Sequence, residues 1–383
     1  MKDSHINLCQ CPECKKNQYN QMEYIVKKED FKILDNQRPL GISGHLRVKD
    51  EAMSIGQCID SCIDALDELI ITYNKSTDGT EEILMKYAKK YPKKIRLYFY
   101  PFDIVLLKDK NKYGYVHSLS NYYNFGYIKI KYQYYIKIDA DQIYFIDKLL
   151  EIRKILLYYN DSKKNIYTAL ILDKISFYIP IKKIRNYFRT IFIKKLFNKD
   201  KEYKYNGLEE CLNFKDFILF SKIRDKKDMT LILGGFDLIL KNNNLYINSN
   251  FPCNGCVGDH FIINPSSKYK YELQNNGIEV LKIKRRSIIG FAWVHLGSIK
   301  RKVNISDDNI IKFNDIQYMS SKEFLNIINK LENNFTKYSM EQFTIKYFDK
   351  DKNYLSEDFY NKYMKDILEY AINHQNIHIK RIY

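Results

Sequence analysis

Segments typical of β-strands alternate with helical segments along residues 42–159. Strand-like runs occur at 42–49, 69–73, 95–100 and 134–138. Between them, apolar residues recur every three or four positions in segments that open at Ser54 and at Thr80, as on the buried face of a helix. This alternation is typical of βαβ units, whose parallel strands need crossover connections. The sequence therefore predicts an α/β fold with a mainly parallel sheet flanked by helices.

Local signals refine this prediction. Ser54 followed by Gln57 has the spacing of a capping box at the start of a helix. A further helix is expected at about 146–159 and a further strand at 167–172. Runs at 231–240 and 245–247 flank an asparagine triplet and predict a β-hairpin.

Composition changes along the chain suggest three parts. Residues 1–40 are polar and irregular, residues 41–303 carry the regular pattern, and residues 304–383 have helical apolar spacing. A basic amphipathic insertion interrupts the middle part at about 174–229.

The net charge points to an anionic partner. Lys and Arg number 63 against 46 Asp and Glu, a formal charge of +17, which suits nucleic acid, anionic lipid or a phosphorylated ligand. No run of about 18 apolar residues exists, so no transmembrane helix is expected. The first residues lack the apolar region of a signal peptide, and we expect a cytoplasmic protein.

Two acids directly follow the strand at 134–138. Asp139 and Asp141 can both direct oxygens at one hard divalent cation such as Mn²⁺ or Mg²⁺, which would neutralise charge on a diphosphate. The alternative is a solvated pair that caps the helix near Ile146.

Polar clusters also follow two other strands. Asn74 to Thr80 contains Asp78 and suits either a turn with a helix cap or the binding of a nucleotide's base or ribose. Arg47, Lys49 and Glu51 end the first strand. Ligands of parallel sheets bind beyond the carboxyl ends of strands, so the three clusters together favour a binding site.

These motifs carry a family resemblance. Residues 46–52, 73–83 and 136–141 resemble bacterial GT-A-type glycosyltransferases of lipooligosaccharide synthesis, nearest the β-1,4-N-acetylgalactosaminyltransferases. Residues 235–241 and 246–247 look like the strand pair that follows the family's metal motif, so the similarity covers about 41–250. It implies a GT-A (Rossmann-like) fold and the use of a nucleotide sugar.

The resemblance also implies roles for individual residues. Asp139 and Asp141 match the family's DxD metal motif, with Asp141 the direct ligand. Asn74 stands where the family usually has an acid. The implied nucleotide-sugar contacts are Arg47, Lys49, Glu51, Asn74, Asp78 and Asp139.

Chemistry adds candidates beyond the resemblance. His295 lies between basic clusters, and its imidazole can complete a Mn²⁺ site, although a lone histidine is also commonly structural. Lys300 and Arg301 would stabilise a UDP leaving group. For the catalytic base we select Asp259, with Asp237 and His260 as competitors.

Two further segments leave alternatives open. Residues 175–197 form a basic amphipathic pattern that suits an anionic bilayer surface or an ordinary surface helix. Cys9, Cys11 and Cys14 could join Cys253 and Cys256 in a zinc site. Free thiols are the preferred interpretation, because the two groups lie far apart in sequence.

The combined prediction is a metal-dependent inverting glycosyltransferase. It would move a sugar, preferably N-acetylgalactosamine, with N-acetylglucosamine or galactose as alternatives, from a UDP-sugar to a lipooligosaccharide acceptor. It would work at the inner face of the cytoplasmic membrane without a nucleic-acid partner. A basic nucleic-acid-binding protein or a metal-dependent phosphohydrolase is the alternative.

Overall fold

The computed structural model describes residues 8–105, 113–158, 229–248, 261–273, 279–281, 285–301, 310–312 and 355–373, with a few single positions between 178 and 187. The expected strand at 167–172, most of the basic segment at 175–197 and the loop that contains Asp259 lie outside these residues.

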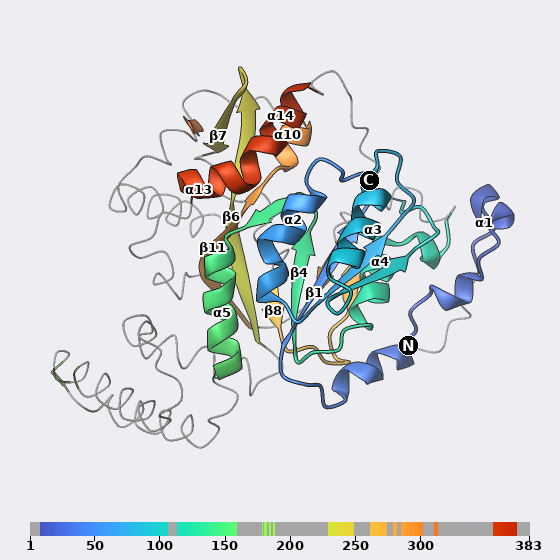
Figure 1. The fold of residues 1–383 in the computed structure, drawn as a ribbon. Coiled ribbons are helices and arrows are strands. Elements are labelled where there is room, and N and C mark those ends of the chain that lie inside the picture. Colours follow the sequence, from blue (N-terminus) through green and yellow to red (C-terminus); the bar gives the residue numbers. More distant parts are fainter. Residues whose placement is uncertain are drawn as a thin grey trace.

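Most of the described strands form one large mixed sheet whose centre is parallel (Figure 1). Its order is β12-β7-β6-β8-β4-β1-β2-β3, and β11 pairs with β6 and β5. Strands β3, β2, β1 and β4 are mutually parallel, whereas β8 runs antiparallel to β4. The bounds are β1 Ile42–Val48, β2 Glu68–Tyr73, β3 Ile95–Phe99, β4 Tyr134–Asp139, β5 Gln142–Tyr144, β6 Met229–Lys241, β7 Asn244–Asn248, β8 Phe261–Ile263, β11 Arg285–His295 and β12 Ile310–Lys312. A separate pair joins β9 Tyr271–Leu273 to β10 Glu279–Leu281.

Helices cover both faces of the parallel centre. The helices on one face are α2 Ile55–Cys62, η3 Ile63–Ala65, α3 Thr80–Lys90 and α5 Ile146–Tyr158. In the same apolar cluster lie α13 Glu357–Phe359, η8 Tyr360–Met364 and α14 Lys365–Asn373. The bounds on the other face are α1 Pro12–Lys16, η1 Gln21–Glu23, η2 Glu29–Asp35, η5 Tyr115–His117 and α4 Leu119–Tyr127. Finally, α10 spans Gly297–Arg301 and follows β11.

The alternation of side chains along the strands produces these two layers. Leu69 and Ile71 of β2 pack in the core with α2 and α3, whereas Ile70 packs in the core with α4. The same alternation places Tyr135 of β4 with α4, as a period of two requires. The predicted α/β fold with a mainly parallel sheet flanked by helices is therefore confirmed.

The hairpin prediction is also confirmed. Strands β6 and β7 pair antiparallel around Asn242 and Asn243, which have φ of 49° and 59°. Asparagine tolerates this left-handed conformation better than most residues. The prediction of a capping box was wrong, because Ser54 directly precedes α2 but its side chain makes no capping hydrogen bond to the helix. Its hydroxyl donates to Glu51 Oε2 at 3.2 Å instead.

Candidate active site

The carboxyl ends of β1, β2 and β4 meet at one edge of the sheet. In the ladder, Arg47 of β1 lies opposite Asp139 of β4 on one side and Thr72 of β2 on the other. The predicted polar clusters therefore come together at this edge, as expected for adjacent parallel strands.

Strand β11 brings His295 to the same edge. His295 lies in register with Gln142 of β5 and with Asp237 of β6. This double pairing puts the imidazole between two carboxylates: Nε2 is 3.3 Å from Asp141 Oδ2, and Nδ1 is 3.0 Å from Asp237 Oδ1. Asp237 is 2 % exposed, and its second oxygen accepts a hydrogen bond from Ser298 Oγ at 2.7 Å.

The two carboxylates control the charge of His295. Burial lowers the pKa of its imidazole, but Asp141 and Asp237 outweigh burial and raise the pKa to about 10. At neutral pH and without a metal ion, the ring therefore carries a proton on both nitrogens. Asp237 also fixes the ring orientation, so that Nε2 faces Asp141.

Gly297 leaves the space that the ring needs. A Cβ atom at this position would lie 2.7 Å from Nε2 of His295. Any larger residue would therefore displace the imidazole from Asp141.

Lys300 connects the first strand end to the DxD segment. On α10, its Nζ contacts Glu51 Oε2 and lies 3.9 Å from Asp141 Oδ2. The side chains are 11 % exposed for Lys300 and 15 % for Glu51, so solvent weakens their attraction less than on an open surface. Residues that are distant in sequence thus form one charged centre.

A second buried cation accompanies Asp139. Lys137 is 2 % exposed, and its Nζ lies 3.3 Å from Asp139 Oδ2 and 3.9 Å from Glu279 Oε1. The ammonium also lies over the ring of Tyr123, at 5.1 Å from its centroid, and the guanidinium of Arg47 lies 5.0 Å from the same centroid. The face of Tyr123 therefore helps to hold both cations beside the acids of this edge.

The first two polar loops brace one another. Asp78 Oδ2 accepts from the backbone N–H of Ala52 at 2.9 Å, and its Oδ1 accepts from the backbone N–H of Thr80 at 3.0 Å. Asp50, at φ 52°, accepts from the backbone N–H of Thr77 at 2.8 Å. Both carboxylates therefore shape the loops.

The remaining predicted contacts at this edge also have partners within the chain. Asn74 is buried and donates from Nδ2 to the carbonyls of Tyr100 and Phe102, each at 2.9 Å. Lys49 pairs with Asp103 at 2.7 Å. Asn74 thereby holds the chain that follows β3 against the site.

The donor set suits a divalent ion. Asp139 and Asp141 offer carboxylate oxygens and His295 an imidazole nitrogen, the ligands that Mn²⁺ accepts. The 3.3 Å between Asp141 Oδ2 and His295 Nε2 is near the roughly 3 Å edge of an octahedral site with bonds of about 2.1 Å. Asp237 behind the imidazole completes the usual carboxylate–histidine–metal order. The ligand types and the Asp141–His295 pair therefore suit the predicted metal, but the ligand atoms of Asp139, Asp141 and His295 are not all within 4.8 Å of one another, and Asp139 contacts Lys137 instead.

Some predicted residues lie outside this geometry. Asp259, the expected base, and His260 are not among the described residues, and Arg301 is placed only as the last residue of α10. Asp237, a competing base, has one oxygen near His295 and the other bonded to Ser298.

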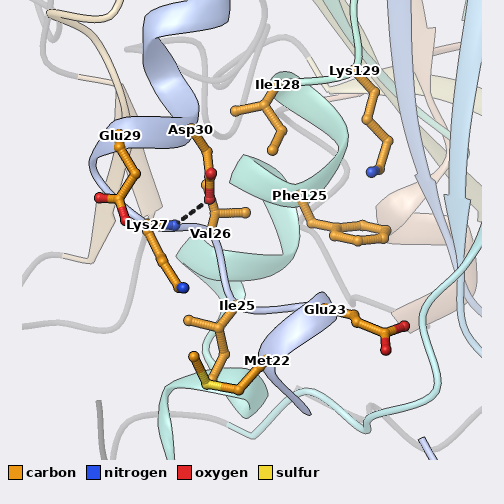
Figure 2. Close-up of a pocket in the computed structure, with 10 residues that line it drawn as sticks. All are labelled: Met22, Glu23, Ile25, Val26, Lys27, Glu29, Asp30, Phe125, Ile128 and Lys129. Atoms are coloured by element: carbon orange, nitrogen blue, oxygen red, sulfur yellow. Dashed lines mark hydrogen bonds between the residues drawn. The ribbon is translucent and has the colours of Figure 1, made fainter. Parts of the chain in front are cut away.

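A hollow of about 300 Å³ lies elsewhere, between residues 22–30 and the end of α4 (Figure 2). Figure 2 shows Phe125, Ile128 and Lys129 on one side and Asp30 on the other. Because β4 begins soon after Lys129 and reaches the acids only at its far end, this hollow is separate from the candidate site.

Sequence reasoning missed two parts of the site. Lys137 lies inside a strand-like run and carried no motif, and Asp237 was considered only as a base. The alternation of Tyr135, Lys137 and Asp139 on one strand face was the available signal for Lys137.

The fold and site define an α/β protein with a cluster of acids, one histidine and lysines at the carboxyl edge of its sheet. Residues 21–168 match the family model described as "Beta-1,4-N-acetylgalactosaminyltransferase (CgtA)". The predicted resemblance is therefore confirmed for these residues, while β6, β7 and His295 lie outside the match. No protein of curated function matches the chain.

Solved structures give weaker likenesses. Glucosyl-3-phosphoglycerate synthase from Mycobacterium tuberculosis with Mn²⁺, UDP and phosphoglyceric acid is 19% identical, and the match covers 30% of this chain and 38% of that one, with a TM-score of 0.21. The same enzyme with Mg²⁺ and UDP is 18% identical over 31% and 38% of the chains, again with a TM-score of 0.21. At this TM-score the likeness decides neither fold nor function, and the chain spans well under half of these enzymes.

Proposed function

We propose that this protein is a metal-dependent glycosyltransferase that transfers a sugar from a UDP-sugar to a hydroxyl group of a lipooligosaccharide. The main support is the convergence of Asp141, His295 and Lys300 at the carboxyl edge of the sheet, in a chain whose residues 21–168 match a transferase family. N-acetylgalactosamine is the first candidate sugar, because the family description names it. N-acetylglucosamine and galactose are the alternatives.

The proposed roles follow from the positions of the charged groups. Asp139, Asp141 and His295 would hold Mn²⁺ or Mg²⁺, which when bound offsets the negative charge of the diphosphate leaving group. Lys300 and Arg301 would bind the phosphates, and Glu51 positions Lys300 through their ion pair. Arg47 in β1 and Lys49 directly after it would contact the uridine, beside the loops held by Asp78 and Asn74.

The transfer itself is proposed to invert the anomeric configuration. Asp259 would take the proton of the acceptor hydroxyl as the new bond to the anomeric carbon forms and the bond to the phosphate oxygen breaks. UDP leaves with the electron pair, and the proton stays on the carboxylate.

The acceptor explains the proposed location. A lipid-linked acceptor would bring the enzyme to the inner face of the cytoplasmic membrane, with the basic segment at 175–197 as the contact to anionic lipid. No helix of the described residues has the length and apolarity to span a bilayer.

A panel of UDP-sugars with Mn²⁺ tests this proposal. UDP release and thermal stabilisation are measured for each sugar, first alone and then with lipooligosaccharide, and NMR of the product gives its anomeric configuration. We expect one sugar to stand out and Asp141→Asn to abolish its transfer, whereas Asp64→Asn, an exposed control on η3, retains it. Salt-sensitive DNA binding without turnover of any UDP-sugar contradicts the proposal.

A further inference from the structure

Three cysteines and one histidine meet on the face of the sheet that α4 covers. Cys9, Cys11 and Cys14 are all buried, and their sulfur atoms lie within 4.8 Å of one another and of a ring nitrogen of His117. His117 is 1 % exposed and comes from η5, about a hundred residues further along the chain. None of the described cysteines forms a disulfide.

The spacing of these atoms is that of a tetrahedral metal site. Nε2 of His117 lies 3.5 Å from Cys11 Sγ and 3.1 Å from Cys14 Sγ. Zn²⁺ with Zn–S bonds of about 2.3 Å and a Zn–N bond of about 2.0 Å places sulfur and nitrogen about 3.5 Å apart. The two nitrogen–sulfur distances are therefore close to those of a zinc site.

The surroundings prepare the four groups for a metal ion. Nδ1 of His117 lies 2.6 Å from the carbonyl oxygen of Asp103. A carbonyl oxygen can only accept, so Nδ1 carries the proton and Nε2 presents its lone pair to the sulfurs. The backbone N–H of Cys14 points at Cys11 Sγ at 3.4 Å, as suits a thiolate.

We propose that Cys9, Cys11, Cys14 and His117 bind one structural Zn²⁺ ion. This site does not use Cys253 or Cys256, and it is separate from the Asp141 centre. The histidine supplies the fourth ligand that the cysteine run lacks by itself, and the predicted interpretation as free thiols did not consider it. Four protein ligands leave no open position, so the ion is structural rather than catalytic.

The ion would fasten the N-terminal segment to the chain that follows β3. Asp103 accepts from His117 through its carbonyl, pairs with Lys49 through its carboxylate, and donates its backbone N–H to Glu13 at 3.1 Å. Gly114 allows the close approach, because a Cβ atom there would lie 2.7 Å from Cys9 Cβ. The zinc site thus supports one side of the candidate active site without contacting it.

Metal analysis of the full-length protein tests this proposal independently of any transferase activity. Protein purified without chelator is expected to hold about one zinc per chain, and zinc X-ray absorption should show three sulfurs and one nitrogen. Cys11→Ser and Cys14→Ser should lose the metal, whereas Cys62→Ser and the double variant Cys253→Ser/Cys256→Ser should keep it.

The histidine is tested by a separate pair of variants. His117→Ala should weaken Co²⁺ binding at least tenfold, and His117→Cys should retain the metal with a four-sulfur absorption spectrum. Iron in place of zinc, a Cys11–Cys14 disulfide in metal-free wild-type protein, or loss of zinc on changing Cys253 and Cys256 would overturn the proposal. The X-ray absorption of the wild type decides the ligand set even where a variant fails to fold.

Discussion

Asp237 lies 3.0 Å from Nδ1 of His295, so that the opposite nitrogen of the ring faces Asp141. These residues come from β6, β11 and the turn after β4. The charge of Asp237 therefore acts on the DxD segment through the imidazole.

Replacing Asp237 tests this coupling. Asp237→Asn keeps an acceptor for Nδ1 but removes the charge, so the His295 ring becomes a poorer metal ligand. We expect the Mn²⁺ concentration for half-maximal transfer to rise tenfold to a hundredfold with the fold intact by circular dichroism. Ser298→Ala removes only the hydrogen bond to Asp237 and should raise this Mn²⁺ concentration a few-fold at most. Equal behaviour of Asp237→Asn and the wild type would show that the carboxylate does not support the metal.

Metal binding should release a proton. Because the pKa of His295 stands near 10 without a metal ion, its ring is protonated at pH 7, and a cation at Nε2 must displace that proton. The apparent Mn²⁺ affinity is expected to rise with pH, by up to tenfold per unit below pH 10. Calorimetry at pH 7 in two buffers of different ionisation enthalpy should report about one proton released. No dependence on the buffer would mean that His295 is not a ligand.

Lys300 and Glu51 should act as a pair in nucleotide binding. Lys300→Met removes the cation and leaves Glu51 and Asp141 facing the phosphates, so UDP affinity in the presence of Mn²⁺ should fall about tenfold or more. Glu51→Gln releases Lys300 from its partner and should weaken UDP binding less than Lys300→Met does. The double variant is expected to differ from the sum of the single variants, because the two groups are in contact. Lys90→Met on the exposed side of α3 is the control; a similar loss there would remove the specific role.

His45 predicts how the fold responds to acid. Its imidazole is fully buried beside Tyr135 and Thr72, and burial, together with Arg47 and Lys137, lowers its pKa to about 3. The unfolded chain, with a pKa near 6.5, binds a proton first, so this group destabilises the fold as pH falls from 6.5 towards 3. At pH 5 the expected loss is about 2 kcal/mol relative to pH 7.

Urea unfolding at the two pH values measures this effect. His45→Gln should reduce the difference between pH 7 and pH 5, whereas Tyr135→Phe removes a hydrogen-bond partner without a titrating ring and should leave the difference unchanged. If the difference in the free energy of unfolding between pH 7 and pH 5 is unchanged in His45→Gln, other groups cause the loss of stability in acid.

Local patterns predicted the parallel centre of the sheet well. Strands β1, β2 and β3 and helix α3 each have their own apolar period and turn residues, and the structure places them within a residue or two of the expected bounds. Helix α4 was missed for a physical reason: all nine of its residues are buried, including the polar Ser120, Asn121 and Asn124, so its polar residues do not mark a solvent-exposed face.

The candidate site was predictable only in part. Asp139 and Asp141 follow a strand and carry a motif of their own. The contact of His295 with Asp237 and that of Lys300 with Glu51 depend on how β11 and α10 pack. No local spacing encodes such long-range pairing. The same holds for His117, whose partners lie near the start of the chain.

The position of β11 late in the chain also has a consequence during translation. A ribosome that has released the first 145 residues has delivered β1 to β5 and both acids of the DxD segment. The imidazole and the ammonium that face Asp141 emerge much later, with β11 and α10. The nascent protein can therefore form the parallel centre of its sheet well before the charged centre at the sheet's edge is complete.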